Sequence, residues 1–155
     1  MNRLTPQKAA LFDLTHDLRS ELLAALRSED LGFGLGALTL TLGQLLTEQG
    51  EIQAAYTRLF RTFELKFDLA APTDLTTVEQ LTAWFVSLDA EMWAALSALS
   101  NEQLDQPVPR GSHAVPLGLT FYTYRESVFI FAAKASVYLR ALGRELPGQV
   151  RGFIG

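Results

Sequence analysis

YLRALGRELP, the stretch from Tyr138 to Pro147, decides the fold of this chain. It closes a long apolar segment that begins near Leu119. Gly143 suits the left-handed conformation in which helices commonly end, and Pro147 cannot continue a helix. The stretch therefore predicts the C-terminus of a long helix, largely buried, at about Leu142.

Three earlier segments show helical periodicity, because their apolar residues recur at spacings of three and four. They predict helices at about residues 5–28, 38–67 and 76–99. The apolar stripe of the first helix is Leu11, Leu14, Leu18, Leu22 and Ala25. With the last helix, these segments predict an all-α fold, a four-helix bundle with a long connection between the third and fourth helices.

Details of the second and third helices refine this prediction. The second stripe starts at Leu38, and one polar residue, Gln49, interrupts it. Thr76 and Glu79 fit a capping box at the start of the third helix, in which each side chain satisfies a backbone donor of the other. The tail after Pro147 is expected to be loosely held.

Composition limits the classes of function. The 155 residues predict a single domain, 1–155, with enough length for one core. The net charge of −4 disfavours a nucleic-acid partner, and the absence of cysteine excludes disulfides and thiolate chemistry. We expect no membrane span, and the N-terminus has no signal-peptide pattern, which favours a cytoplasmic location.

Two short motifs carry a resemblance to a known family. TLGQLL, residues 41–46, opens the second helix, and YLRALG, residues 138–143, closes the fourth. With four helices of this length, the chain resembles the DinB-like four-helix-bundle proteins over nearly its whole length. The resemblance implies a bundle that commonly dimerises and that holds a divalent metal with three histidines, one on the second helix and two spaced by four on the fourth.

This chain lacks those histidines. Alignment on Gly43 places the ligand position of the second helix at Glu48, and alignment on Arg140 and Gly143 places those of the fourth at Ser127 and Phe131. Serine is a poor ligand and phenylalanine is none, so Glu48 alone coordinates metals well. The sequence predicts that the metal site is lost and that no cofactor is bound.

The same positions predict a pocket. Glu48, Ser127 and Phe131 would surround it, Tyr124 and Lys134 would line it, and Glu48 and Lys134 would form an ion pair across it. Alternatively, Lys134 reaches solvent and Ser127 bonds back to the helix carbonyl four residues earlier. Both interpretations fit the sequence.

The sequence assigns no catalytic role to any of the other polar residues, so the catalytic residues are unknown. Glu48 and Glu51 fit either a pair of catalytic carboxylates or two solvated acids. His16 lies between Asp13 and Asp17, which predicts an exposed face. His113 falls in the long connection without an evident partner.

The sequence therefore favours a binding or interaction module, a homodimer whose cavity takes a small molecule or nothing. The alternative is a divergent enzyme related to thiol-dependent S-transferases, with altered ligands around Glu48. Aromatic residues on several sides of the fourth helix fit either a dimer contact or the core. They are Phe121, Tyr122, Tyr124, Phe129 and Phe131.

Overall fold

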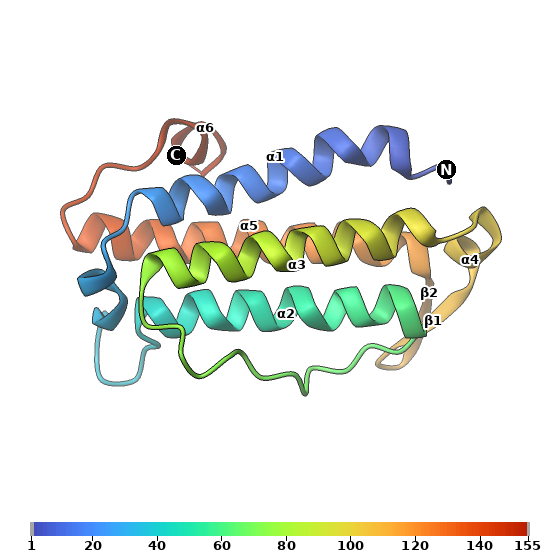
Figure 1. Cartoon of the computed structure of the whole chain (residues 1–155), viewed down its shortest axis with the longest axis horizontal. Helices are drawn as coiled ribbons and strands as arrows, with labels where there is room; N and C mark the ends of the chain where they lie inside the picture. Colours follow the sequence, from blue (N-terminus) through green and yellow to red (C-terminus); the bar gives the residue numbers. More distant parts are fainter. Residues whose placement is uncertain (1, 155) are drawn as a thin grey trace.

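The computed structural model describes residues 2–154, without the side chains of residues 5–9 and 154. Its long helices are α1 (Thr5–Ala24), α2 (Leu42–Thr62), α3 (Val78–Ala98) and α5 (Leu117–Ala141). They lie side by side, with α1 and α5 running in one direction and α2 and α3 in the other (Figure 1). The predicted all-α four-helix bundle is confirmed.

The segments that connect the long helices account for the directions in which the helices run. Because α2 and α3 are parallel, residues 63–77 return along the whole length of the bundle (Figure 1). The predicted long connection between α3 and α5 stays at one end, where it forms a short helix and a hairpin. Its elements are α4 (Asn101–Asp105), β1 (Pro107–Arg110) and β2 (His113–Pro116), the two strands pairing antiparallel.

The predicted bounds of the first two helices were wrong. α1 ends at Ala24, and a 3-10 turn, η1 (Ser28–Gly32), follows. α2 begins only after Thr41, whose hydroxyl accepts a hydrogen bond from the backbone N–H of Gln44 while the Gln44 side chain accepts one from Thr41 N–H. This cap excludes Leu38 from the helix, and Leu38 is fully exposed.

The start of α3 lies one residue later than predicted. Thr77 and Gln80 form the capping box instead of Thr76 and Glu79. The Ser28 hydroxyl also accepts a hydrogen bond from Val78 N–H, at 3.1 Å, which satisfies a further free donor of this helix start. At the end of α5 the prediction was right, because the helix ends at Ala141, Leu142 caps it and Gly143 follows with a φ of 69°.

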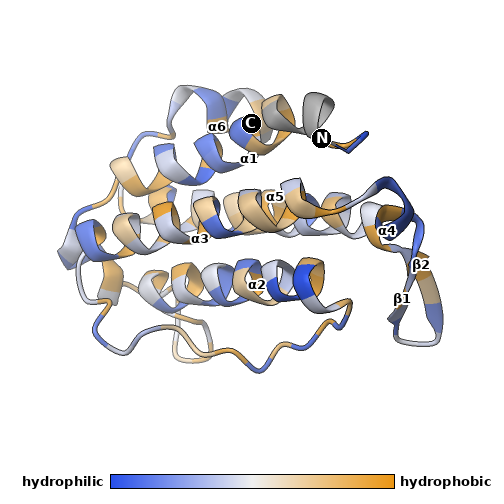
Figure 2. Cartoon of the chain, turned by 45° about the vertical axis from the view of Figure 1, so that its right-hand side comes forward, coloured by the Kyte–Doolittle hydropathy of each residue, from blue (hydrophilic) through white to orange (hydrophobic). Residues whose placement is uncertain are grey.

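The core fills the space between the four long helices. Figure 2 shows that α3 and α5 are largely apolar and that α2 is more mixed. A final helix, α6 (Gly148–Ile154), packs against α1 and α5 and buries Val150 completely. The expectation of a loose tail was therefore wrong. Among residues 2–154, no helix combines the length and the apolar character that crossing a membrane requires.

Candidate functional site

A cavity of about 200 Å³ lies between α2 and α5. It contains four of the five residues that the sequence placed around a pocket: Glu48, Ser127, Phe131 and Lys134. The helical spacing explains this, because residues 127, 131 and 134 share one side of α5. The other lining residues are Leu45, Gln49, Ile52 and Ile130.

Two further hollows share lining residues with the cavity. Leu45 and Lys134 also line a hollow of about 330 Å³ beside the loop that precedes α2. Glu48 and Ile52 also line one of about 340 Å³ beside the segment that follows α2. The cavity therefore adjoins a hollow on either side.

Gln49 is the most unusual residue of the cavity. Its side chain is buried, at 2% exposure, yet its amide nitrogen has no hydrogen-bond acceptor among the described residues. A buried donor without a partner costs about 1–3 kcal/mol. Native proteins tolerate few such groups, and each one points to a bound water, ion or ligand or to a strained site.

The charged residues of the cavity do not neutralise each other. Glu48 and Lys134 line the same space, but no ion pair within 4.0 Å joins them or joins either one to another described residue. The predicted ion pair was therefore wrong. The Ser127 hydroxyl donates to the carbonyl of Tyr124, three residues earlier, at 2.6 Å. Its oxygen still has a lone pair free to accept.

Tyr124 does not line the cavity. It is fully buried, and its hydroxyl lies 2.6 Å from Nε2 of His16 on α1. The sequence placed His16 on an exposed face, which was wrong, because His16 is 4% exposed. Nδ1 of His16 lies 3.4 Å from a carboxylate oxygen of Asp89, close to it but without a hydrogen bond.

A second set of polar contacts adjoins this pair in the interior. Arg19 donates to the Gln53 carbonyl at 2.8 Å and to the Asp89 carboxylate at 2.6 Å. The Gln53 amide donates to the other Asp89 oxygen at 2.7 Å. The Arg19 guanidinium also lies over the ring of Phe85, 4.2 Å from its centroid. These contacts join α1, α2 and α3 through side chains in the interior of the bundle.

Burial sets the protonation of the His16 and Tyr124 pair. It lowers the pKa of His16 to about 3, helped by the positive charge of Arg19 and opposed by Asp89. Burial also raises the pKa of Tyr124 far above its ordinary value. Both groups are therefore neutral at pH 7. Since Asp89 favours a proton on Nδ1, the Tyr124 hydroxyl donates to Nε2.

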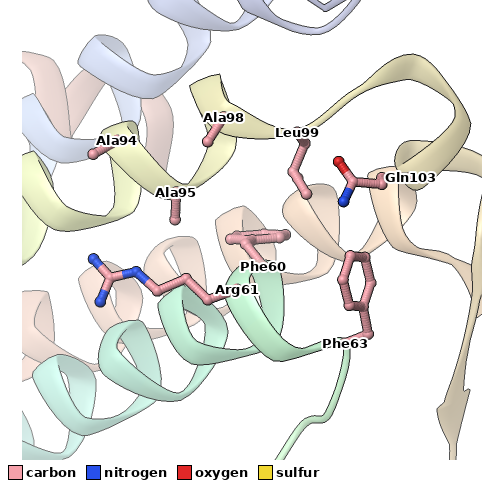
Figure 3. A pocket seen from close by; sticks show the side chains of 8 residues that line it. All are labelled: Phe60, Arg61, Phe63, Ala94, Ala95, Ala98, Leu99 and Gln103. Carbon is pink, nitrogen blue, oxygen red and sulfur yellow. The ribbon is translucent and has the colours of Figure 1, made fainter.

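A separate cavity of about 360 Å³ lies between the C-terminal ends of α2 and α3 (Figure 3). Its walls are mainly apolar, and Arg61 extends away from Phe63 and Gln103 (Figure 3). Arg61 is already in contact with Glu91, at 3.4 Å. The cavity contains none of the residues that the sequence singled out.

The remaining polar residues that the sequence singled out either support the fold or lie on the surface. Glu51 accepts a hydrogen bond from Ala71 N–H at 2.8 Å, which holds the segment after α2 against that helix. Glu48 and Glu51 both line the adjoining hollow. His113 is exposed on β2.

The donor set at the expected metal positions does not fit a transition metal. Glu48 supplies a carboxylate and Ser127 a hydroxyl that donates to its own helix, while Phe131 has no donor atom. Within the described part of the chain, no three His, Asp or Glu side chains lie close enough together to hold a metal ion. Stable transition-metal sites use three or four nitrogen, sulfur or carboxylate ligands.

Comparisons with known proteins identify the fold. A DinB-like protein of Bacillus subtilis, YjoA, superposes with a TM-score of 0.76 at 16% identity, covering 92% of this chain and 97% of that one. A DinB-like protein of Bacillus cereus superposes with a TM-score of 0.68 at 17% identity, covering 90% and 93%. The chain thus has the fold of the DinB-like proteins. No protein-family model and no curated protein matches its sequence.

Sequence reasoning missed His16, Arg19, Gln53 and Asp89, which are the polar centre of the bundle. One signal was present, since Gln49 and Gln53 are spaced by four on the apolar side of α2. Two buried amides on one helix face predict polar partners on the facing helices.

Proposed function

We propose that this protein is a small-molecule-binding module and that the cavity between α2 and α5 is its site. The ligand is a small apolar amine that also carries a hydrogen-bond acceptor. The observation that carries this proposal is the buried amide donor of Gln49, without a partner, beside the unpaired carboxylate of Glu48.

The chemistry of the lining supports this class of ligand. Glu48 offers a negative charge to an ammonium group, and the Gln49 amide offers a donor to a carbonyl oxygen. The apolar part of the wall takes a hydrocarbon body and consists of Leu45, Ile52, Ile130 and Phe131. Ser127 and Lys134 are the other polar residues of the wall. At about 200 Å³ the cavity is smaller than the roughly 300–1,000 Å³ of sites for drug-sized molecules, which favours a small metabolite.

A divergent enzyme receives less support. An activated nucleophile needs a neighbouring base or a lowered pKa, and neither accompanies Ser127, whose hydroxyl donates to the Tyr124 carbonyl. The His16 and Tyr124 pair has acid and base groups, but both side chains are buried away from the cavity. A binding role therefore explains more features of the cavity than a catalytic role does.

The test uses three related compounds and isothermal titration calorimetry. Leucinamide has an amine, an apolar side chain and a carbonyl acceptor. 4-Methylpentanamide lacks the amine, and 3-methylbutylamine lacks the carbonyl. We expect leucinamide to bind most tightly, because only it satisfies both Glu48 and Gln49.

Two variants locate the site. Glu48→Gln should weaken leucinamide binding about tenfold and leave 4-methylpentanamide unaffected, because a charged hydrogen bond is worth about 1.5–3 kcal/mol. Glu102→Gln, an exposed substitution on α4, is the matched control. Equal affinity for the three compounds, or leucinamide binding that survives Glu48→Gln unchanged, would refute the proposal.

A further inference from the structure

We propose that the cavity between the C-terminal ends of α2 and α3 is a second ligand site, which binds an aromatic carboxylate that also carries a carbonyl group. Its volume of about 360 Å³ lies within the roughly 300–1,000 Å³ of cavities that hold drug-sized molecules. The cavity around Glu48 has an acidic wall, whereas the described residues that line this one include no acid. The two sites therefore select ligands of opposite charge.

Small residues on α3 leave the space open. Three alanines line the cavity on this side, and their methyl groups do not extend to the opposite helix: Ala94, Ala95 and Ala98. Phe60 and Phe63 of the α2 end supply the facing wall (Figure 3). Phe60 and Ala95 are buried while Ala94 and Ala98 are exposed, so the cavity has an apolar floor and opens to solvent along α3. Rings on one wall and methyl groups on the other suit a flat aromatic ligand.

The backbone of Phe63 supports a role for its ring in this wall. Phe63 follows α2 with a φ of 62° and a ψ of 15°, in the left-handed conformation. In the described part of the chain it is the only residue other than glycine with a positive φ. Glycine is usual at such a helix end, because a Cβ makes the left-handed conformation costly. Residues held in costly conformations cluster at ligand sites, where the strain serves to place a side chain.

The side-chain amide of Gln103 supplies a hydrogen-bond donor in a fixed orientation. Its Oε1 accepts a hydrogen bond from Ser100 N–H at 2.8 Å, as part of the cap of α4. Because only the oxygen of the amide can accept this bond, the position of the nitrogen is settled too. Figure 3 shows the nitrogen on the side of Phe63 and the oxygen on the other side. Among the described residues, none accepts a hydrogen bond from this nitrogen, so a ligand carbonyl can.

Arg61 supplies a positive charge in another part of the cavity, where its side chain extends away from Gln103 (Figure 3). Its guanidinium reaches the carboxylate and the carbonyl of Glu91 only at 3.4 Å, which is long for a hydrogen bond. Both side chains of this pair are half exposed, so the pair contributes little and a ligand carboxylate can displace it. An aromatic ring with a carbonyl at one end and a carboxylate at the other would meet both donors.

Isothermal titration calorimetry with three substituted benzenes tests this assignment. 4-Acetylbenzoate carries both acceptors, acetophenone lacks the carboxylate, and 4-ethylbenzoate lacks the carbonyl. We expect 4-acetylbenzoate to bind about tenfold more tightly than either of the others, because only it bonds to both Gln103 and Arg61.

Two variants separate the contributions of the two donors. Gln103→Glu keeps the oxygen that caps α4 and replaces the donor by an acceptor, so it should weaken 4-acetylbenzoate and acetophenone about tenfold and 4-ethylbenzoate much less. Gln106→Glu makes the same chemical change on an exposed side chain nearby and is the matched control. Arg61→Gln should weaken the two acids about fivefold and leave acetophenone unchanged. Arg151→Gln removes the same charge from an exposed position on α6 and is its control.

Phe63→Gly tests the wall. Glycine suits the left-handed backbone, so the variant should fold, and the loss of the ring should weaken all three compounds. Circular dichroism confirms the fold of each variant before calorimetry. Equal affinity for the three compounds would overturn the proposal, and so would 4-acetylbenzoate binding that survives both Gln103→Glu and Arg61→Gln unchanged. The absence of any heat of binding with millimolar 4-acetylbenzoate would overturn it as well.

The two ligand sites are tested independently of each other. Glu48 and Gln49 do not line this cavity, and Gln103 does not line the other one. Leucinamide should therefore bind equally to Gln103→Glu and to the wild type, and 4-acetylbenzoate should bind equally to Glu48→Gln and to the wild type. If either site fails its own test, the result at the other still stands.

Discussion

The hydroxyl of Tyr124 lies 2.6 Å from Nε2 of His16, and this contact joins α5 to α1 across the interior of the bundle. Both residues are almost completely shielded from solvent, since Tyr124 is 0% and His16 4% exposed. A neutral imidazole is the only form of His16 that accepts this hydrogen bond. Folding and the protonation of His16 are therefore linked.

We predict that His16 makes the protein less stable in acid. Its pKa falls from about 6.5 in an unfolded chain to about 3 in the folded one. Between these values the unfolded chain binds a proton that the folded one does not. The contribution of His16 to the free energy of unfolding is complete above about pH 6.5. It falls as the pH is lowered toward 3, by at most about 1.4 kcal/mol per pH unit.

Urea unfolding across this pH range checks the prediction. His16→Gln keeps an acceptor for Tyr124 but does not titrate, so its free energy of unfolding should fall less steeply between pH 6 and pH 4. Asp30, whose pKa is also lowered in the folded protein, is present in both proteins and cancels from the difference. Equal slopes for wild type and variant would show that the folded protein protonates His16 readily.

Removing the guanidinium of Arg19 should be costly. Arg19→Met removes the donor of the Gln53 carbonyl and the cation paired with the Asp89 carboxylate, which keeps only the Gln53 amide as a donor. Breaking a buried pair in this way costs about 3–5 kcal/mol. Arg61→Met, whose partner Glu91 is half exposed, should cost about 1 kcal/mol or less. Chemical denaturation measures both, and similar losses would contradict the position of Arg19 in the interior.

Gln49→Leu should stabilise the protein while it removes ligand binding. The substitution keeps the size of the side chain and deletes a buried donor without an acceptor, a gain of about 1 kcal/mol. Gln53→Leu is the contrasting variant, because Gln53 bonds to both Arg19 and Asp89 and its loss should destabilise. If Gln49→Leu destabilises as much as Gln53→Leu, the Gln49 amide has a partner in solution.

The start of α2 gives a simple test of its register. Leu42 is 1% exposed inside the helix, so Leu42→Ala should cost about 2–5 kcal/mol. Leu38 is fully exposed before the cap at Thr41, so Leu38→Ala should change stability by less than about 0.5 kcal/mol. Thermal and urea denaturation distinguish them, and a large effect at Leu38 would restore the longer helix that the sequence predicted.

The apolar periodicity of the sequence predicted the four long helices, because each buries one stripe in a shared core. It placed the buried face of α1 only in part, since Leu18 and Leu22 are buried as predicted. That face includes His16 and Arg19, whereas Leu11 and Leu14 are only partly buried. A rule that assigns polar side chains to solvent fails where such side chains satisfy each other inside the bundle.

The candidate site was predictable in part. Residues 127, 131 and 134 share one side of a helix at any register, so Ser127, Phe131 and Lys134 could be grouped from their spacing. Tyr124 has the same spacing but lies deeper, where it meets His16. Which side of α5 faces α1 depends on the packing of two helices far apart in the sequence, and helical spacing alone does not contain that information.

The direct test of the α2–α5 cavity is the ¹H–¹⁵N NMR signal of the Gln49 side-chain amide, assigned by its absence from Gln49→Leu. Titration with leucinamide should shift this signal until it saturates, and the shift should be lost in Glu48→Gln. Zinc ions should leave it unchanged. If the signal does not shift with leucinamide but shifts with one equivalent of zinc, the cavity holds a metal ion and not an organic amine.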